Sequence, residues 1–266
     1  MKKVLTALLL ISLLFTLCAC SIPADSFMSQ AKVSSLVKTY GKTPQAEVTI
    51  SFKTSSTGQK VEVKVVYDLL LEQAPLAVTR FIQIANEGGY DNTLADTLNK
   101  DHDYIILGRY KKNESRYFDM RAGDTTFAGE FKQNGYRQPK DGYAKFDMFS
   151  LAMYHAADGA HFDSANGTLI LSLSSTRTLN PDNYAVFAQL ASISVKVDDN
   201  DALTYRKVPS FVRDSLYGFS ARVTRNIYDA SDDNKSPVSA SVMSSEVLLK
   251  VSILGGKDWS KLPHIG

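Results

Sequence analysis

Two runs of alternating apolar and polar residues constrain the fold of this chain more than any other feature. They span residues 47–52 (EVTISF) and 60–69 (KVEVKVVYDL), and Gly58 lies in the short segment between them. A period of two is typical of strands that bury one face, and a glycine-containing connection of this length is typical of a β-hairpin. The sequence therefore predicts an antiparallel sheet that begins here.

A helix is predicted directly after this hairpin, over residues 76–86. Pro75 suits its first turn, and Gly88 follows its end, where a C-cap glycine is common. Apolar residues with helical spacing are expected to face the core: Val78, Phe81, Ile82 and Ala85.

The rest of the chain contains more strands than helices. Strands are predicted over residues 168–173, 184–190 and 246–254, and a helix is expected within residues 203–217. The polar and aromatic middle, residues 91–145, favours loops and short strands. The pattern indicates a mainly β fold, either a closed antiparallel barrel or a sandwich, with about two helices.

The N-terminus has the pattern of a signal peptide. Lys2 and Lys3 precede an apolar run over residues 4–17, which is too short to span a bilayer with ordinary flanks. The run ends in Leu-Cys-Ala-Cys, which resembles the lipobox of bacterial lipoproteins. This resemblance implies a signal peptide over residues 1–19, lipidation at Cys20 and a tether over residues 20–43. A plain secretory signal or an uncleaved anchor is the alternative.

Composition limits what the remaining 247 residues (266 minus 19) can be. Both cysteines lie within the first 20 residues, so the body has neither a disulfide nor a thiolate nucleophile. Hydrophobic residues make up 44% of the chain, which is enough for a globular core. A net charge of +2 gives no reason to expect nucleic acid as a partner.

Four blocks of residues, taken in order, resemble the cyclophilin family of peptidyl-prolyl isomerases. The first is an Ala-Pro-x-x-Val-x-x-Phe helix that ends in Gly-Gly-Tyr-Asp, and the second resembles the family's G-E-F-x-x-N-G. The third resembles its S-M-A … N-S-A-S-S-Q-F-F-I stretch, and the fourth its L-D-G-x-Y-A-V-F-G strand. In this sequence the blocks occupy residues 72–91, 129–135, 150–171 and 179–187.

The resemblance implies a closed antiparallel cyclophilin-like β-barrel, capped by about two helices, over residues 44–266. It also implies catalysis of X-Pro isomerisation, whose barrier of ~18–20 kcal/mol comes from amide resonance. Such catalysis needs an apolar pocket and a donor aimed at the prolyl nitrogen, but no cofactor and no metal.

The family's donor is an arginine in an F-H-R-V segment, and this chain departs from that pattern. The arginine position falls on Asp96 or Thr97, neither of which is a cationic donor. The next family segment, F-M-x-Q-G-G-D, has two candidate matches, residues 104–108 and 118–124. The catalytic residue is therefore unknown. A displaced cation, if one exists, is to be sought among Arg109, Lys111, Lys112, Arg116 and Arg121.

The substrate groove is assigned from the same resemblance. The family's pocket-floor phenylalanine becomes Ile170, and its glutamine becomes Thr168. The residues expected to line a peptide groove are Tyr104, Leu107, Thr168, Ile170 and Tyr184.

The four histidines offer a different kind of site. His155 and His161 lie near Asp158 and Asp163, but their spacing matches no helical HExxH pattern. We expect loop histidines exposed to solvent, and no metal.

Three functions are open at this point. The first is a foldase, lipid-anchored at the extracytoplasmic face of the cell membrane, that acts weakly or not at all on the X-Pro bonds of exported or envelope polypeptides. The second is a non-catalytic lipoprotein that uses the same groove to hold a peptide or protein. A lipoprotein of unrelated function is the third, and it would show a different topology.

Overall fold

The structure is a computed structural model of the 266-residue chain. It describes residues 26–265, except 56, 100–102, 123, 125, 138, 140–141, 156–164, 176–178, 180–182, 198–207, 220, 233 and 245. The predicted signal peptide and Cys20 lie outside the described residues, as do His102 and His161.

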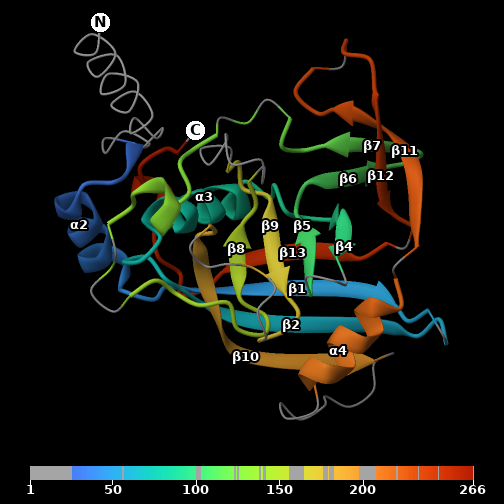
Figure 1. The fold of residues 1–266 in the computed structure, drawn as a ribbon, viewed down its shortest axis with the longest axis horizontal. Helices are drawn as coiled ribbons and strands as arrows, with labels where there is room; N and C mark the ends of the chain where they lie inside the picture. Colours follow the sequence, from blue (N-terminus) through green and yellow to red (C-terminus); the bar gives the residue numbers. More distant parts are fainter. Residues whose placement is uncertain are drawn as a thin grey trace, which may run out of the picture.

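Thirteen strands form a single sheet that curls into a nearly closed barrel (Figure 1). Their order in the sheet is β12-β11-β7-β6-β3-β13-β1-β2-β10-β8-β9-β5-β4. The strands are β1 (Gln45–Lys53), β2 (Lys60–Leu69), β3 (Thr93–Leu94), β4 (Thr97–Asn99), β5 (Tyr104–Leu107), β6 (Tyr110–Asn113), β7 (Arg116–Asp119), β8 (Leu151–Met153), β9 (Leu169–Ser172), β10 (Val186–Val197), β11 (Arg222–Asp229), β12 (Val238–Met243) and β13 (Leu248–Ile253).

The predicted hairpin is confirmed as β1 and β2. They pair antiparallel with Val48 opposite Val65 and Ile50 opposite Val63, and all four of these side chains are buried. The polar residues between them point away from the interior, as the period of two requires. β13 and β10 continue the sheet on either side of this pair.

The predicted helix is confirmed as α3 (Pro75–Asn86), which packs on the barrel core. Val78, Phe81 and Ile82 are fully buried, and Ala85 is partly buried against the same core. The Phe81 ring lies 5.2 Å from the Phe187 ring and 5.5 Å from the Tyr90 ring, measured between centroids.

The segment expected to be part of a tether instead contains the helix α2 (Gln30–Tyr40). Its buried side chains Val33, Leu36 and Tyr40 pack inward, and Tyr40 stacks on Trp259 with the ring centroids 4.5 Å apart. Since α2 is held by core contacts, the folded unit begins before residue 44.

Four strands extend beyond the barrel on the far side of β3. We call β6, β7, β11 and β12 the outer extension (Figure 1). Within it β11 pairs parallel with β7, unlike the antiparallel pairs of the barrel, and it pairs antiparallel with β12. A small apolar cluster around Tyr110, Ile227 and Val242 holds these strands together. The sequence analysis did not predict the β11–β12 hairpin.

The mainly β, barrel-type prediction is confirmed, with three α-helices among the described residues. The third, α4 (Val208–Tyr217), lies within the segment where a helix was expected. Among the described residues, no helix combines the length and apolarity needed to cross a bilayer.

Candidate functional site

Directly opposed residues on five neighbouring strands form a row across the outside of the barrel. Thr97 on β4 lies opposite Ile106, and Ile106 lies opposite Ile170 on β9. Ile170 in turn lies opposite Ala152 on β8, and Ala152 lies opposite Val186 on β10. Because opposed residues in a sheet share a face, this row forms one continuous outer surface.

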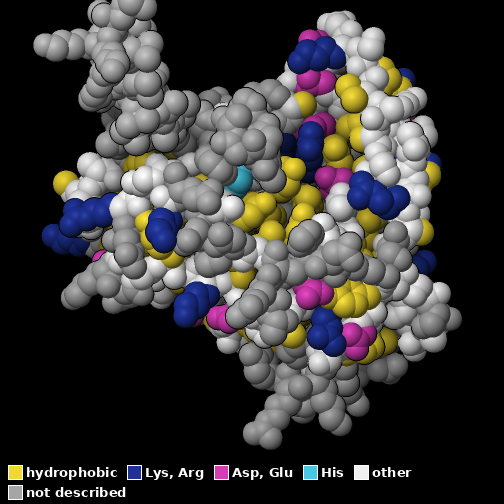
Figure 2. All heavy atoms as spheres, in the orientation of Figure 1, with side chains coloured by type: hydrophobic (Ala, Val, Ile, Leu, Met, Phe, Trp, Pro, Cys, Tyr) yellow, Lys and Arg dark blue, Asp and Glu magenta, His cyan; other side chains and the backbone are white. Residues whose placement is uncertain are grey.

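Aromatic rings surround this row. Tyr104, Tyr154, Tyr184 and Phe146 are partly buried against the small apolar cluster of Ala152, Ile170 and Val186. Figure 2 shows hydrophobic side chains gathered over β5 and β9, with charged side chains beside them toward the outer extension. We call this surface the outer patch. It comprises Tyr104, Ala152, Tyr154, Ile170, Tyr184 and Val186.

The Gly-Glu-Phe block fixes one side of the outer patch. Glu130 is buried, and its two carboxylate oxygens accept hydrogen bonds from the backbone N–H groups of Leu76 (2.8 Å) and Ala77 (3.0 Å). These N–H groups lie in the first turn of α3 and have no partner within the helix itself. Negative charge is favoured at this end of a helix. Burial raises the pKa of Glu130 to about 8, although the two N–H groups act in the opposite direction.

Phe131, the residue after Glu130, connects the N-terminus of α3 with the outer patch. The Phe131 ring stacks against His155 at 5.2 Å, and His155 lies 4.6 Å from the Tyr184 ring. The His155 ring is buried and its Nε2 lies 2.6 Å from the carbonyl oxygen of Asn183. The expectation of a solvent-exposed loop histidine is therefore wrong for His155, although it holds for His264. Among the residues that the structure describes, no cluster of metal-binding side chains is present.

The position where the family's arginine was expected lies at the junction of β3 and β4. Asp96 lies between these two strands, and Thr97 begins β4 at the end of the outer row. Burial raises the pKa of the Asp96 carboxyl, while Arg109 acts in the opposite direction. The Thr97 hydroxyl donates a hydrogen bond to Asp96 Oδ1 (3.2 Å). This position thus presents a hydroxyl and a neighbouring carboxyl, neither of which is a cation.

Arg109 is the cation that the structure places beside this junction. Its Nε and Nη2 donate to Asp119 Oδ2 at 3.0 and 2.8 Å, and its guanidinium carbon lies 5.1 Å from the Tyr110 ring centroid. Burial raises the pKa of Tyr154, and Arg109 opposes that rise, so the guanidinium lies within electrostatic range of the outer patch. These two hydrogen bonds to Asp119 fix the orientation of the Arg109 guanidinium.

The other candidate cations are engaged elsewhere. Arg121 is buried: its Nε donates to the Gly108 carbonyl (3.2 Å), its Nη2 to the Gly89 carbonyl (2.6 Å), and its Nη1 to Asp124 (3.2 Å). Lys112 pairs with Glu246 at 2.5 Å, and Arg116 lies 5.2 Å from the Tyr228 ring. Lys111 lies on β6, in the outer extension.

The two candidate matches for the family's next segment are now separated in space. Residues 104–108 include β5, which pairs directly with β9 and so adjoins the outer patch. Residues 118–124 begin in β7 of the outer extension and end in the buried Arg121–Asp124 pair. The first match is therefore the one that lies at the candidate site.

Three of the five predicted groove residues meet on the outer patch: Tyr104, Ile170 and Tyr184. Burial raises the pKa of the Tyr184 phenol to about 12. Leu107 lies apart from them, because its side chain faces the barrel interior opposite Leu169. Thr168 is buried at the start of β9, and its hydroxyl has no hydrogen-bond partner among the described residues.

The sequence analysis missed Ala152, Tyr154 and Val186 as members of this surface. Tyr154 follows β8 and is held by a hydrogen bond from its backbone N–H to the Thr168 carbonyl (2.9 Å). Alternation along the Ser-Leu-Ala-Met-Tyr run places Ala152 and Tyr154 on one face, so the run itself carried the information.

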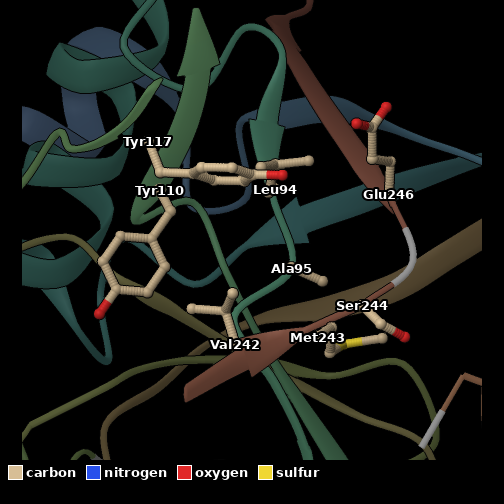
Figure 3. Close-up of a pocket in the computed structure, with 8 residues that line it drawn as sticks. All are labelled: Leu94, Ala95, Tyr110, Tyr117, Val242, Met243, Ser244 and Glu246. Carbon is tan, nitrogen blue, oxygen red and sulfur yellow. The ribbon is translucent and has the colours of Figure 1, made fainter. Parts of the chain in front are cut away.

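A small pocket lies where the outer extension meets the barrel (Figure 3). Its lining residues are Leu94, Ala95, Tyr110, Tyr117, Val242, Met243, Ser244 and Glu246. Burial, with Asp96 nearby, raises the pKa of Tyr110 to about 12. Tyr110 therefore lines this pocket and lies within electrostatic range of Asp96.

Two solved structures to which this chain is similar are cyclophilins. A cyclophilin structure from Cryptosporidium parvum is 15% identical, with a TM-score of 0.41, and covers 80% of this chain and 99% of its own. A Mimivirus cyclophilin is 14% identical, with a TM-score of 0.39, and covers 80% of this chain and 91% of its own. No curated protein sequence matches the chain.

A family model provides the assignment. The model described as "cyclophilin type peptidyl-prolyl cis-trans isomerase/CLD" matches residues 49–206, more than half of the chain. This range contains α3, the Gly-Glu-Phe block, every residue of the outer patch and all of the hairpin except the first four residues of β1. The chain belongs to the cyclophilin-type peptidyl-prolyl cis-trans isomerase family.

Proposed function

We propose that this chain is a membrane-tethered, extracytoplasmic cyclophilin-like protein that binds proline-containing segments of exported polypeptides on the outer patch, with weak or absent isomerase activity. One observation carries the proposal. The outer row keeps an apolar floor at Ile170 and Ala152, but it ends in Thr97 beside Asp96, where the family supplies an arginine.

Binding of a proline-containing peptide and catalysis of its isomerisation need different groups in the site. A proline ring is held by apolar and aromatic surface, which the outer patch retains. Isomerisation also needs a donor to the prolyl nitrogen as that atom becomes pyramidal. Loss of one such preorganised donor typically costs ~100–1000-fold in rate. Thr97 and Asp96 do not provide a cationic one.

Replacing an aromatic ring of the patch should weaken peptide binding. We expect Tyr104→Ala or Tyr184→Ala to raise the Kd of an apolar proline-containing peptide ~10-fold or more, since aromatic anchors carry much of the binding energy at such sites. Isothermal titration with the purified protein measures this. Tyr228→Ala is the matched control, because Tyr228 is a partly buried aromatic on the outer extension. Equal weakening in the control would contradict the assignment of the patch.

A second candidate function is an active isomerase that uses a displaced cation. The observation in its favour is the place of Arg109, forked on Asp119 and within electrostatic range of Asp96 and Tyr154. Under this function Arg109→Ala would lower the rate ~100-fold or more and leave peptide affinity nearly unchanged, because a transition-state contact acts on rate alone.

The tether is tested by labelling. The proposal expects a fatty-acid analogue to label the protein in cells and Cys20→Ala to abolish the label, because the thiol is the proposed acceptor. Membrane fractionation should then show an uncleaved or released form. A Cys20→Ala variant that labels and fractionates like the unchanged protein would refute lipidation at this residue.

A further inference from the structure

Basic side chains are concentrated at the end of the molecule that carries α2. The sequence contains no acidic residue from position 26 to position 46, whereas it contains three lysines there. Two more lysines lie in the C-terminal segment, and Lys132 and Arg137 follow shortly after Glu130. These residues, which we call the basic end, are Lys32, Lys38, Lys42, Lys132, Arg137, Lys257 and Lys261.

Side-chain contacts bring these three segments together. The C-terminal segment docks on α2 through the Tyr40–Trp259 stack, and Lys257 Nζ donates to the Tyr40 carbonyl at 2.5 Å. The loop after Glu130 reaches the start of α2, because the Tyr136 ring lies 5.1 Å from the Phe27 ring. Figure 2 shows basic side chains over α2 at this end.

Two acidic side chains partly offset this charge. Glu72 pairs with Lys42 at 2.7 Å, and Asp258 accepts hydrogen bonds from Ser260. Seven basic groups against these two carboxylates still leave a positive surface. The exposed side chains between Lys32 and Lys38 on α2 include Ser34 and Ser35, so this face is polar and has no apolar anchor for insertion. Such a surface suits a layer of negative charge rather than a hydrophobic groove.

We propose that the basic end binds the anionic phospholipid headgroups of the membrane to which the chain is tethered. α2 begins ten residues after Cys20, and ten residues span at most ~35 Å. A lipid on Cys20 would therefore keep this face within reach of the headgroups, at high effective concentration. The outer patch, on the side of the barrel, would then remain open to polypeptides. This orientation rests on the proposed tether, but the headgroup affinity does not.

The test uses a chain that starts at residue 20 with Cys20→Ser, so that it carries no acyl chain but keeps every described element. Its sedimentation with phosphatidylcholine vesicles is compared with that of vesicles that also contain phosphatidylglycerol. We expect binding only to the anionic vesicles, and we expect added salt to abolish it because exposed charges are screened. Because no lipid is attached, failure here is distinguishable from failure of lipidation at Cys20.

A matched pair of charge reversals locates the contact. Lys32→Glu with Lys38→Glu should lower the vesicle partition coefficient at least ~10-fold, given the affinity that each lysine near a surface contributes. Lys53→Glu with Lys60→Glu makes the same change in net charge at the tip of the β1–β2 hairpin, and should have little effect. Thermal unfolding checks that both variants are folded.

Three results would overturn the proposal. The first is equal loss of binding in the two double variants, which would mean that net charge rather than this face decides. The second is binding to neutral and anionic vesicles alike. The third is no vesicle binding together with salt-sensitive binding to polyglutamate, which would assign the basic end to an acidic polymer instead.

Discussion

Phe81→Ala should lower the free energy of unfolding by ~3–5 kcal/mol, the usual cost of truncating a buried phenylalanine. The Phe81 side chain is fully buried between α3 and the barrel, in contact with the rings of Tyr90 and Phe187. Removing the ring leaves a cavity that the rigid barrel wall cannot fill. Urea denaturation followed by circular dichroism measures the change.

Val238→Ala is the control for this variant. Val238 on β12 is 69% exposed, so its truncation should change stability by no more than ~0.5 kcal/mol. If Phe81→Ala costs as little as the control, the packing of α3 on the barrel described here is incorrect.

Asp124→Ala should be similarly destabilising, by ~3–5 kcal/mol, because it removes the partner of two buried cations. Asp124 Oδ2 lies 2.9 Å from Arg80 Nη2 and 3.2 Å from Arg121 Nη1. The two arginine side chains are only 9% and 5% exposed. Without the carboxylate, both guanidinium groups stay buried with their charge uncompensated.

The same denaturation experiment tests this prediction against an exposed ion pair. Asp214 pairs with Arg213 at 3.0 Å and its side chain is 63% exposed, so Asp214→Ala should cost ~1 kcal/mol or less. A loss for Asp124→Ala no larger than that for Asp214→Ala would show that the Arg80–Asp124–Arg121 network is not a structural element of the barrel.

Local pattern was enough to predict the barrel strands that bury one face strongly. Residues 60–69 alternate so regularly that only one register can bury Val61, Val63 and Val65. The bounds of helix α3 were equally well predicted, because Pro75 marks its start, Gly88 follows its end, and apolar residues with helical spacing lie between them. In these elements the periodicity of the local sequence is sufficient to predict the secondary structure, and tertiary contacts stabilise the same structure.

Elements stabilised mainly by distant partners could not be predicted in this way. Helix α2 has apolar residues at helical spacing, but its position on the core depends on Trp259, more than 200 positions later in the chain. Strands β11 and β12 are largely exposed, so their alternation is weak, and they depend on pairing with β7. The contact of α2 with Trp259 and the pairing of β11 with β7 join residues far apart in the sequence, so the local pattern does not indicate them.

The sequence predicted part of the outer patch, but it did not predict the surroundings of Thr97 and Asp96 next to it. Resemblance to the family's blocks indicated Ile170 and Tyr184, and the structure places both on the outer patch. Leu107 was included because it falls in an aligned segment, but strand alternation turns it inward while Tyr104 and Ile106 face outward. The approach of Arg109 to Asp96 depends on how β6 leaves the barrel, which is a property of the whole topology.

We propose that this cyclophilin-type barrel keeps the peptide-binding surface but lacks a cationic donor at the prolyl nitrogen. A proline-limited refolding assay tests it most directly, with the chain that starts at residue 20 so that α2 is retained. The account predicts an acceleration ~100–1000-fold below that of an ordinary cyclophilin at the same concentration, while peptide binding to the same sample is retained. A rate equal to that of an ordinary cyclophilin would contradict it.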